Sequence, residues 1–200
     1  MNIADYLDEL DRALAFDPGL SRRVRPEIES HLREAAEVAG EAVAIRRFGA
    51  PSDIARAYAE AGLPARLRRA WFIAVLLLGV TFVLMRLRTL WLDLPVAADP
   101  LTLIDRGGLV AALACVLLAW ARLRRLPSPP TRVAPLLHVA LGLLALSVGA
   151  SLLRAAEAVP SGGAAPLPLM AASAVAELAL VVLLLGELGR ADRYRRRAAA

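Results

Sequence analysis

The sequence contains no lysine, one cysteine and two histidines, and these scarcities exclude several kinds of chemistry. All 24 basic residues are arginine. Without lysine the chain cannot form a phosphate-binding loop of the Gly-Lys-Ser/Thr type or a Schiff base. The single Cys115 cannot form a disulfide or a thiolate metal site within one chain, so we interpret it as a packing residue.

The sequence also lacks the residue sets that catalysis requires. We find no pair of nucleophile and base, no set of metal ligands and no nucleotide-binding motif. Glu27, His31 and Glu34 have a helical spacing that suits a metal, but a carboxylate-rich site in a bundle needs ligands from several helices. A solvated helix face is therefore the favoured interpretation. We predict no catalytic, cofactor or metal site, and a protein that is not an enzyme.

Apolar sequence, by contrast, is abundant. Hydrophobic residues make up 58% of the chain and the mean hydropathy is +0.55, outside the usual range of soluble proteins. Four apolar runs, at approximately 70–90, 107–122, 133–153 and 168–189, are long enough to form membrane-spanning helices. The predicted fold class is all-α, with a small N-terminal cytoplasmic domain of about four helices before a four-helix transmembrane bundle.

Charge is distributed unevenly, and this predicts the orientation in the membrane. Residues 1–65 carry a net charge of −4, whereas residues 66–200 carry +9. Most arginines of the second part lie at three sites that the positive-inside rule places in the cytoplasm. We therefore expect four spans in a bacterial inner membrane, with both termini inside. No basic flank precedes an apolar core at the N-terminus, so we expect no cleavable signal peptide.

The chain ends in an arginine-rich tail, which we expect to bind anionic lipid headgroups, as such clusters beside a span commonly do. Its candidate lipid-binding residues are Arg193, Arg195, Arg196 and Arg197.

The N-terminal segment, residues 1–65, predicts amphipathic helices. The first has apolar residues at helical spacing from Ile3 to Leu14 and acidic residues on its other side. A turn at 17–19 separates it from a second helix. We expect Pro26 in the first turn of that helix, because proline is costly in a helix interior.

Two more helices are predicted before the first span. The third, Glu41–Phe48, is expected to stop at Gly49, a usual C-terminal cap. The fourth is expected to have Ser52 as its N-cap and to end at Gly62 and Pro64.

Three stretches of this segment resemble a known family. They are YLDELDRAL at 6–14, PEIESHLREA at 26–35 and AIRRFGAPSDIARAY at 44–58. Together they look like the HAAS signalling domain of bacterial membrane proteins, and they are similar to the prefix domain of some efflux permeases. The most specific positions are Glu27, Glu29, His31, Leu32, Arg47, Phe48, Gly49 and Pro51.

The resemblance implies a cytoplasmic helical domain on a multi-span anchor, often working with a PadR-like transcriptional regulator. A transporter-associated or permease-like subunit is the alternative function. Membrane lipids are expected partners, direct nucleic-acid binding is not expected, and self-association is left open. The acidic surface of the first helix is either a solvated face or a docking face for a basic partner. The candidate partner-binding residues are Asp8, Asp11, Glu27, Glu29, His31, Phe48, Gly49 and Pro51.

Two ionisable residues fall inside the predicted spans. Glu177 lies deep in the fourth, where we expect a neutral carboxyl that hydrogen-bonds across helices, with Thr81 and Ser147 as partners. Proton sensing or ion passage is the alternative. On the neutral hypothesis, Glu177→Gln leaves the bundle intact. His138 lies near the cytoplasmic end of the third span, and we interpret it as a polar packing residue.

Overall fold

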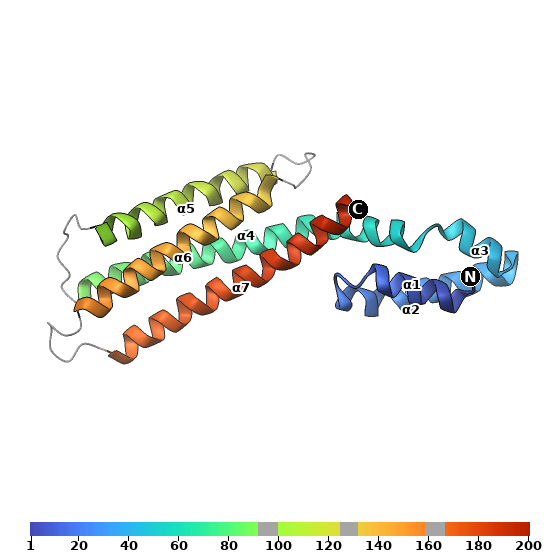
Figure 1. Ribbon diagram of the computed structural model, residues 1–200, viewed down its shortest axis with the longest axis horizontal. Helices are drawn as coiled ribbons and strands as arrows, with labels where there is room; N and C mark the ends of the chain where they lie inside the picture. The colour runs from blue at the N-terminus through green and yellow to red at the C-terminus, as the bar shows by residue number, and fades with distance from the viewer. Residues whose placement is uncertain (92–99, 125–131, 159–166) are drawn as a thin grey trace. The chain divides into compact units, whose positions relative to one another are not determined.

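The computed structural model describes residues 1–91, 100–124, 132–158 and 167–200, and within them the chain forms helices and no strand (Figure 1). The predicted all-α fold class is confirmed. In chain order the helices are α1 (Ile3–Ala13), α2 (Pro18–Ala39), α3 (Glu41–Phe48), α4 (Pro51–Trp91), α5 (Pro100–Arg124), α6 (Val133–Ala158) and α7 (Leu167–Ala199).

Helix α1 begins with a reciprocal cap. The Asn2 side chain accepts a hydrogen bond from the Asp5 backbone N–H at 2.8 Å, and the Asp5 carboxylate accepts one from the Asn2 backbone N–H at 3.1 Å. This capping box satisfies two N–H groups at the helix start. The cap fixes where α1 begins, and the apolar spacing along the helix places Tyr6, Leu7 and Leu10 on its buried face.

Helix α2 starts at Pro18, well before the predicted start. Asp17 is its N-cap, and Asp17 Oδ1 accepts hydrogen bonds from the backbone N–H groups of Gly19 and Leu20 at 3.0 and 3.1 Å. Pro26 lies inside the helix, so its predicted place in the first turn is wrong. A proline there costs about 3 kcal/mol. Burial of one continuous face on both sides of the proline opposes that cost, through Leu20, Val24, Ile28 and Leu32.

Glycines with positive φ bound helix α3. Gly40 has a φ of 82° and Gly49 has a φ of 88°, so both lie in the region that favours glycine. The predicted helix Glu41–Phe48 and its stop at Gly49 are confirmed. At Gly49 ψ is −173°, a combination with positive φ that is essentially restricted to glycine.

Helix α4 differs from the prediction at both ends. Pro51 is its first residue, and the Ala50 carbonyl accepts the first hydrogen bonds, so Ser52 is not its N-cap. The predicted end at Gly62 and Pro64 is also wrong, because the helix continues through both residues. Gly62 serves close packing instead. A Cβ at this position would lie 2.5 Å from the ring of Tyr194.

The described chain divides into two compact units. One, called the headpiece below, consists of Met1–Pro64 and Arg190–Ala200; the other, called the bundle, is Ala65–Gly189. The C-terminal end of α7 therefore packs as part of the headpiece. Its Tyr194 ring contacts Phe16 edge-to-face at 4.9 Å, and the Tyr194 hydroxyl donates to Asp17 Oδ2 at 2.5 Å.

The headpiece has one apolar core, formed by residues of α1, α2, α3 and the start of α4. Phe16, Phe48 and Tyr58 are half-buried and pack against it. Burial at about 25 cal/mol per Å² of apolar surface is the main force that holds such short helices together. The buried members are Tyr6, Leu7, Leu10, Leu14, Leu20, Val24, Ile28, Leu32, Ile45 and Ala55.

Helices α4, α5, α6 and α7 are each long and apolar enough to cross a membrane, and each contains one predicted span. Within the bundle α5 and α6 lie side by side (Figure 1). The Trp71 indole N–H donates to the Val116 carbonyl at 3.0 Å and so joins α4 to α5. Many large apolar side chains remain exposed, including Phe72, Leu118 and Leu183. Exposed apolar surface of this extent is typical of a region that faces lipid.

The glycine conformation at the end of α3 predicts a specific sensitivity. Gly49→Ala forces an L-residue into a glycine-only conformation, so we expect the headpiece to lose about 1–3 kcal/mol of stability. Hydrogen–deuterium exchange of the full-length protein should show faster exchange in α1 and α3. The control is Gly79→Ala, whose new Cβ meets nothing within 4 Å in α4. Equal exchange in the two variants would contradict the prediction.

Candidate functional site

The turn between α3 and α4, with the sequence R-F-G-x-P at residues 47–51, helps to hold the headpiece together. Phe48 packs against the core, and Pro51 is buried at the start of α4. The Gly49 carbonyl accepts a hydrogen bond from the Tyr6 hydroxyl at 3.1 Å, which ties α1 to the turn. Burial, and then the nearby Glu9 carboxylate, raises the pKa of Tyr6, so the hydroxyl stays protonated as a donor. All three predicted partner-binding residues of this turn thus have a folding role.

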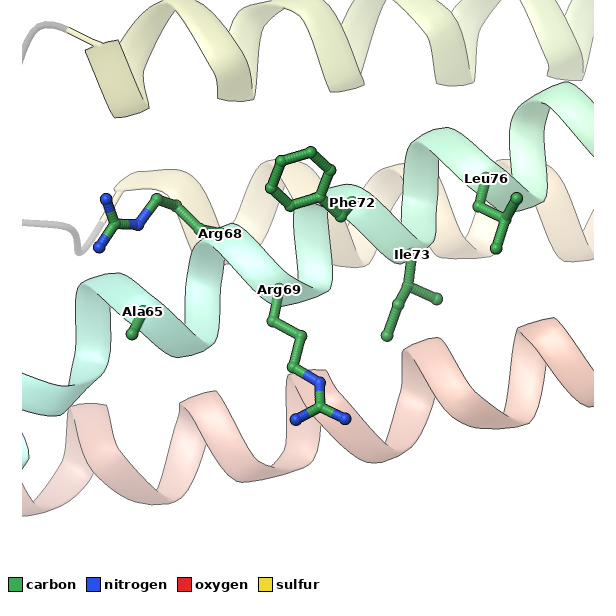
Figure 2. A pocket seen from close by; sticks show the side chains of 6 residues that line it. All are labelled: Ala65, Arg68, Arg69, Phe72, Ile73 and Leu76. Carbon is green, nitrogen blue, oxygen red and sulfur yellow. The ribbon is translucent and has the colours of Figure 1, made fainter.

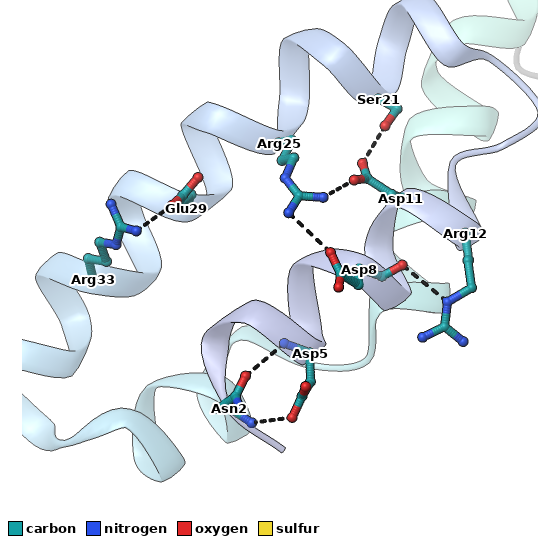
Figure 3. A network of polar contacts seen from close by, with 9 residues as sticks. All are labelled: Asn2, Asp5, Asp8, Asp11, Arg12, Ser21, Arg25, Glu29 and Arg33. Atoms are coloured by element: carbon teal, nitrogen blue, oxygen red, sulfur yellow. Dashed lines mark hydrogen bonds and ion pairs between the residues drawn. The ribbon is translucent and has the colours of Figure 1, made fainter.

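The two predicted docking acids of α1 are engaged within the headpiece (Figure 3). Arg25 of α2 contacts both, pairing with Asp11 and, at 3.1 Å, with Asp8. The Ser21 hydroxyl also donates to Asp11. Hydrogen bonds to Asp11 and then Asp8 raise the pKa of Arg25. This ion-pair group links α1 to α2, and the acidic surface predicted from α1 alone is partly neutralised by its neighbour.

The exposed side of α2 has a different character. Glu27, His31 and Glu34 follow helical spacing and are all exposed, with Glu37 beside them. Within the described chain, none of these three glutamates has an ion-pair partner. Val38 continues the row and is 88% exposed. We call these five residues the α2 outer face; it carries three unneutralised carboxylates and one exposed apolar side chain.

Sequence reasoning found this face only in part. Glu27 and His31 were predicted as partner-binding residues, whereas Glu37 and Val38 were missed. Glu29, also predicted, is half-buried and pairs with Arg33 at 2.5 Å. Helical spacing could have identified Glu34 and Val38 as members of this face, because they lie 7 and 11 positions after Glu27 on the same side of α2. In the part of the chain that the structure describes, no group of three His, Cys, Asp or Glu side chains is arranged to hold a metal.

A second candidate site lies inside the bundle, around Arg88 and Glu177. Both side chains are buried, at 2% and 0% exposure, and Arg88 Nη2 pairs directly with Glu177 Oε2. Arg88 also donates to Ser151 Oγ at 3.1 Å and to Ser173 Oγ at 2.8 Å. Glu177 does bond across helices, as expected, but its partner is the charged Arg88 and not Ser147. Arg88 lies near the end of the predicted first span, beyond the most apolar part of the run, so the sequence pattern did not indicate that it pairs with Glu177.

Ser147, expected as a partner of Glu177, bonds elsewhere. Its hydroxyl lies 2.9 Å from both the carbonyl and Oδ1 of Asp105. Asp105 Oδ2 in turn lies 3.8 Å from Arg154 Nη1, and both residues are buried. Thr81, the other expected partner, is fully buried, and its hydroxyl interacts with the Glu177 carboxyl without the geometry of a full hydrogen bond.

Each of the four bundle helices thus contributes a charged residue to one buried group. We call this set the buried polar cluster: Arg88, Asp105, Arg154 and Glu177, with Ser147, Ser151 and Ser173. Its formal charges cancel. Buried charges in an apolar region are expensive unless they are paired, so this cluster constrains how the four helices fit together.

The remaining predicted polar residues have local contacts. His138 Nδ1 lies 2.9 Å from the Ala134 carbonyl one turn earlier, which agrees with a polar packing residue. In the tail, Arg193 Nε donates to the Phe16 carbonyl at 3.2 Å, and Arg195 pairs with Asp192 at 3.1 Å.

The other two tail arginines complete the predicted lipid-binding set. Arg196 is exposed and Arg197 is half-buried. Since Arg193 bonds to the α1–α2 turn, this part of the tail is engaged by the headpiece.

The ion pair in the bundle yields a prediction that replaces the earlier one for Glu177→Gln, because Gln would leave the Arg88 charge buried and unbalanced. Arg88→Met leaves Glu177 unpaired and should destabilise the bundle by about 3–5 kcal/mol. The double variant Arg88→Met with Glu177→Leu should recover most of that loss. Thermal unfolding in detergent measures both. The control is Arg86→Met, an exposed arginine of the same helix. Equal melting temperatures for Arg86→Met and Arg88→Met would rule out the role of the pair.

The comparisons with known proteins bear on the headpiece. Residues 5–57 match the HAAS family model, a match that covers about a quarter of the chain. Searches of curated proteins and of solved structures found no match. The matched segment runs from α1 to the beginning of α4 and contains the whole R-F-G-x-P turn and the α2 outer face. The resemblance read from the sequence is confirmed: this part of the headpiece is a HAAS domain.

Proposed function

We propose that this chain is a membrane-anchored signalling protein whose headpiece binds a cytoplasmic protein partner. The observation that carries the proposal is the combination of a HAAS domain with four helices long and apolar enough to cross a membrane. Such a chain would hold a protein-binding domain at a membrane surface. Its action would then be binding rather than catalysis.

The α2 outer face is the surface we assign to the partner. Its three glutamates are not neutralised within the described headpiece, whereas the acids of α1 are held by Arg25. A negatively charged helix face steers association with a basic surface and disfavours an acidic one. The exposed Val38 beside it adds an apolar contact. We therefore expect a partner with a basic docking surface.

A PadR-like transcriptional regulator is the specific partner that we propose. The support is the family resemblance together with the charge of the docking face, since DNA-binding regulators commonly carry basic surfaces. In this arrangement the headpiece retains the regulator at a bacterial inner membrane. The arginine distribution supports a topology in which both chain termini are cytoplasmic.

A transporter-associated subunit is the second candidate, and the buried polar cluster is the observation that favours it. Charged residues within spans often mark a pathway for ions or protons. Here, however, the acidic and basic members are equal in number, and Arg88 and Glu177 contact each other directly. This arrangement suits helix assembly better than passage, so we rank this function below partner binding.

The proposal is tested by capture from native membranes with the tagged full-length protein, read by mass spectrometry. Glu27→Arg together with Glu34→Arg should lower recovery of the regulator by about tenfold, which corresponds to about 1.4 kcal/mol. The loss should be greatest at low salt, because screening weakens the attraction between exposed charges.

The matched control is Glu9→Arg together with Glu60→Arg, two exposed acids on other helices of the headpiece. Recovery should stay at the wild-type level with this variant. Recovery of transporter subunits in place of a regulator would support the second candidate. Unchanged capture after the α2 substitutions would remove that face from the proposal.

A further inference from the structure

One face of α4 carries two arginines beside an apolar groove. The groove has a volume of about 560 Å³ and lies along the helix at the start of its apolar part. Its lining positions are spaced by three or four residues, so they share one side of the helix. The lining residues are Ala65, Arg68, Arg69, Phe72, Ile73 and Leu76 (Figure 2).

The basic end of the groove has an excess of positive charge. Arg68 is exposed and has no acidic partner among the described residues. Arg69 extends toward α7 (Figure 2), where its Nε lies 3.3 Å from Glu187 Oε1. The Arg69 side chain is nevertheless 64% exposed, so much of its guanidinium faces outward. Two guanidinium groups with one carboxylate leave a net charge of +1, which suits a singly charged anion such as a phosphodiester.

The apolar end of the groove is partly preorganised. Phe72 is 64% exposed, and its ring packs edge-to-face on Trp71 at 5.1 Å. Trp71 is in turn fixed by its hydrogen bond to the Val116 carbonyl. Leu76 is one turn further along and is 54% exposed. These side chains form the apolar wall of the groove, and Trp71 holds its Phe72 end in place.

The spacing between the two ends matches the layers of a lipid. A helix rises 1.5 Å per residue, so Phe72 and Leu76 lie about 6 and 12 Å beyond Arg68 along the axis. The polar layer on each side of a bilayer core is about 5–8 Å thick. With a phosphate at Arg68, Phe72 would therefore lie near the glycerol, and Leu76 beside the first part of an acyl chain.

We propose that this face of α4 binds one anionic glycerophospholipid. The phosphate lies between Arg68 and Arg69, and one acyl chain lies along Phe72, Ile73 and Leu76. A zwitterionic lipid carries its own cation close to the phosphate, which the net positive charge of the arginines disfavours. Phosphatidylglycerol has no such cation and fits the site. The proposal rests on α4 spanning a membrane and is independent of the partner of the headpiece.

Native mass spectrometry of the full-length chain, delipidated in detergent, tests this site. The added lipids are palmitoyl-oleoyl phosphatidylglycerol and palmitoyl-oleoyl phosphatidylcholine. We expect one phosphatidylglycerol per chain, bound about tenfold more tightly than phosphatidylcholine. Arg68→Gln should abolish the preference. Phe72→Ala should weaken binding of both lipids and keep the preference, because it alters only the apolar wall.

The matched control is Arg122→Gln, which removes an exposed arginine at the end of α5. It should leave the lipid preference unchanged, and circular dichroism should show equal helix content for all variants. If Arg122→Gln reduces the preference as much as Arg68→Gln does, diffuse positive charge explains the binding and the site is refuted. Equal affinity for the two lipids, or a stable dimer that excludes lipid from this face, would also overturn the proposal.

Discussion

Arg88 and Glu177 form a buried ion pair inside a bundle of largely apolar helices. Either charge alone would have a large desolvation cost at this position. Apolar side chains permit many relative positions of neighbouring helices, because lipid is as apolar as the helix surface. A buried pair of opposite charges permits few relative positions, because both charges must stay in contact. Ser151 and Ser173 bond to the same guanidinium, so one interaction group defines how α4, α6 and α7 align. Asp105 extends the constraint to α5 through Ser147 and Arg154.

The headpiece shows a division between residues that maintain the fold and residues that remain available. The capped start of α1, the bond from Tyr6 to Gly49 and the ion pairs of Arg25 all hold short helices around a small core. The α2 outer face contributes little to that core. Its carboxylates therefore create an electrostatic surface that a partner can use without unfolding the domain. The HAAS match includes Tyr6, Gly49 and Arg25 as well as the α2 outer face, which explains why sequence resemblance alone cannot separate the two sets.

Features determined by local chemistry were predictable from the sequence. The stop of α3 at Gly49 depends on one residue that tolerates positive φ, and the apolar runs depend on composition. Features that depend on residues distant in the sequence were not predictable in this way. Gly62 looked like a helix end, but its small size accommodates Tyr194 from the other end of the chain.

The candidate sites show the same difference between features set by local sequence and features set by distant residues. A helical wheel of α1 predicts an acidic face, yet the wheel contains no information about Arg25 on the next helix. The pairing of Arg88 with Glu177 was not predictable, because hydrophobic patterning locates each span but does not show which charges of two spans meet. Glu27 and His31 were identified correctly as exposed positions of α2, since periodicity alone separates them from Ile28 and Leu32.

The most direct test of the account is site-specific photo-crosslinking in native membranes, with the photoreactive residue at position 34 of the α2 outer face or at position 60 of α4. Both positions are exposed acids of the headpiece. The account predicts a crosslinked transcriptional regulator from position 34 and none from position 60. Transporter subunits crosslinked at position 34, or the same products from both positions, would contradict it.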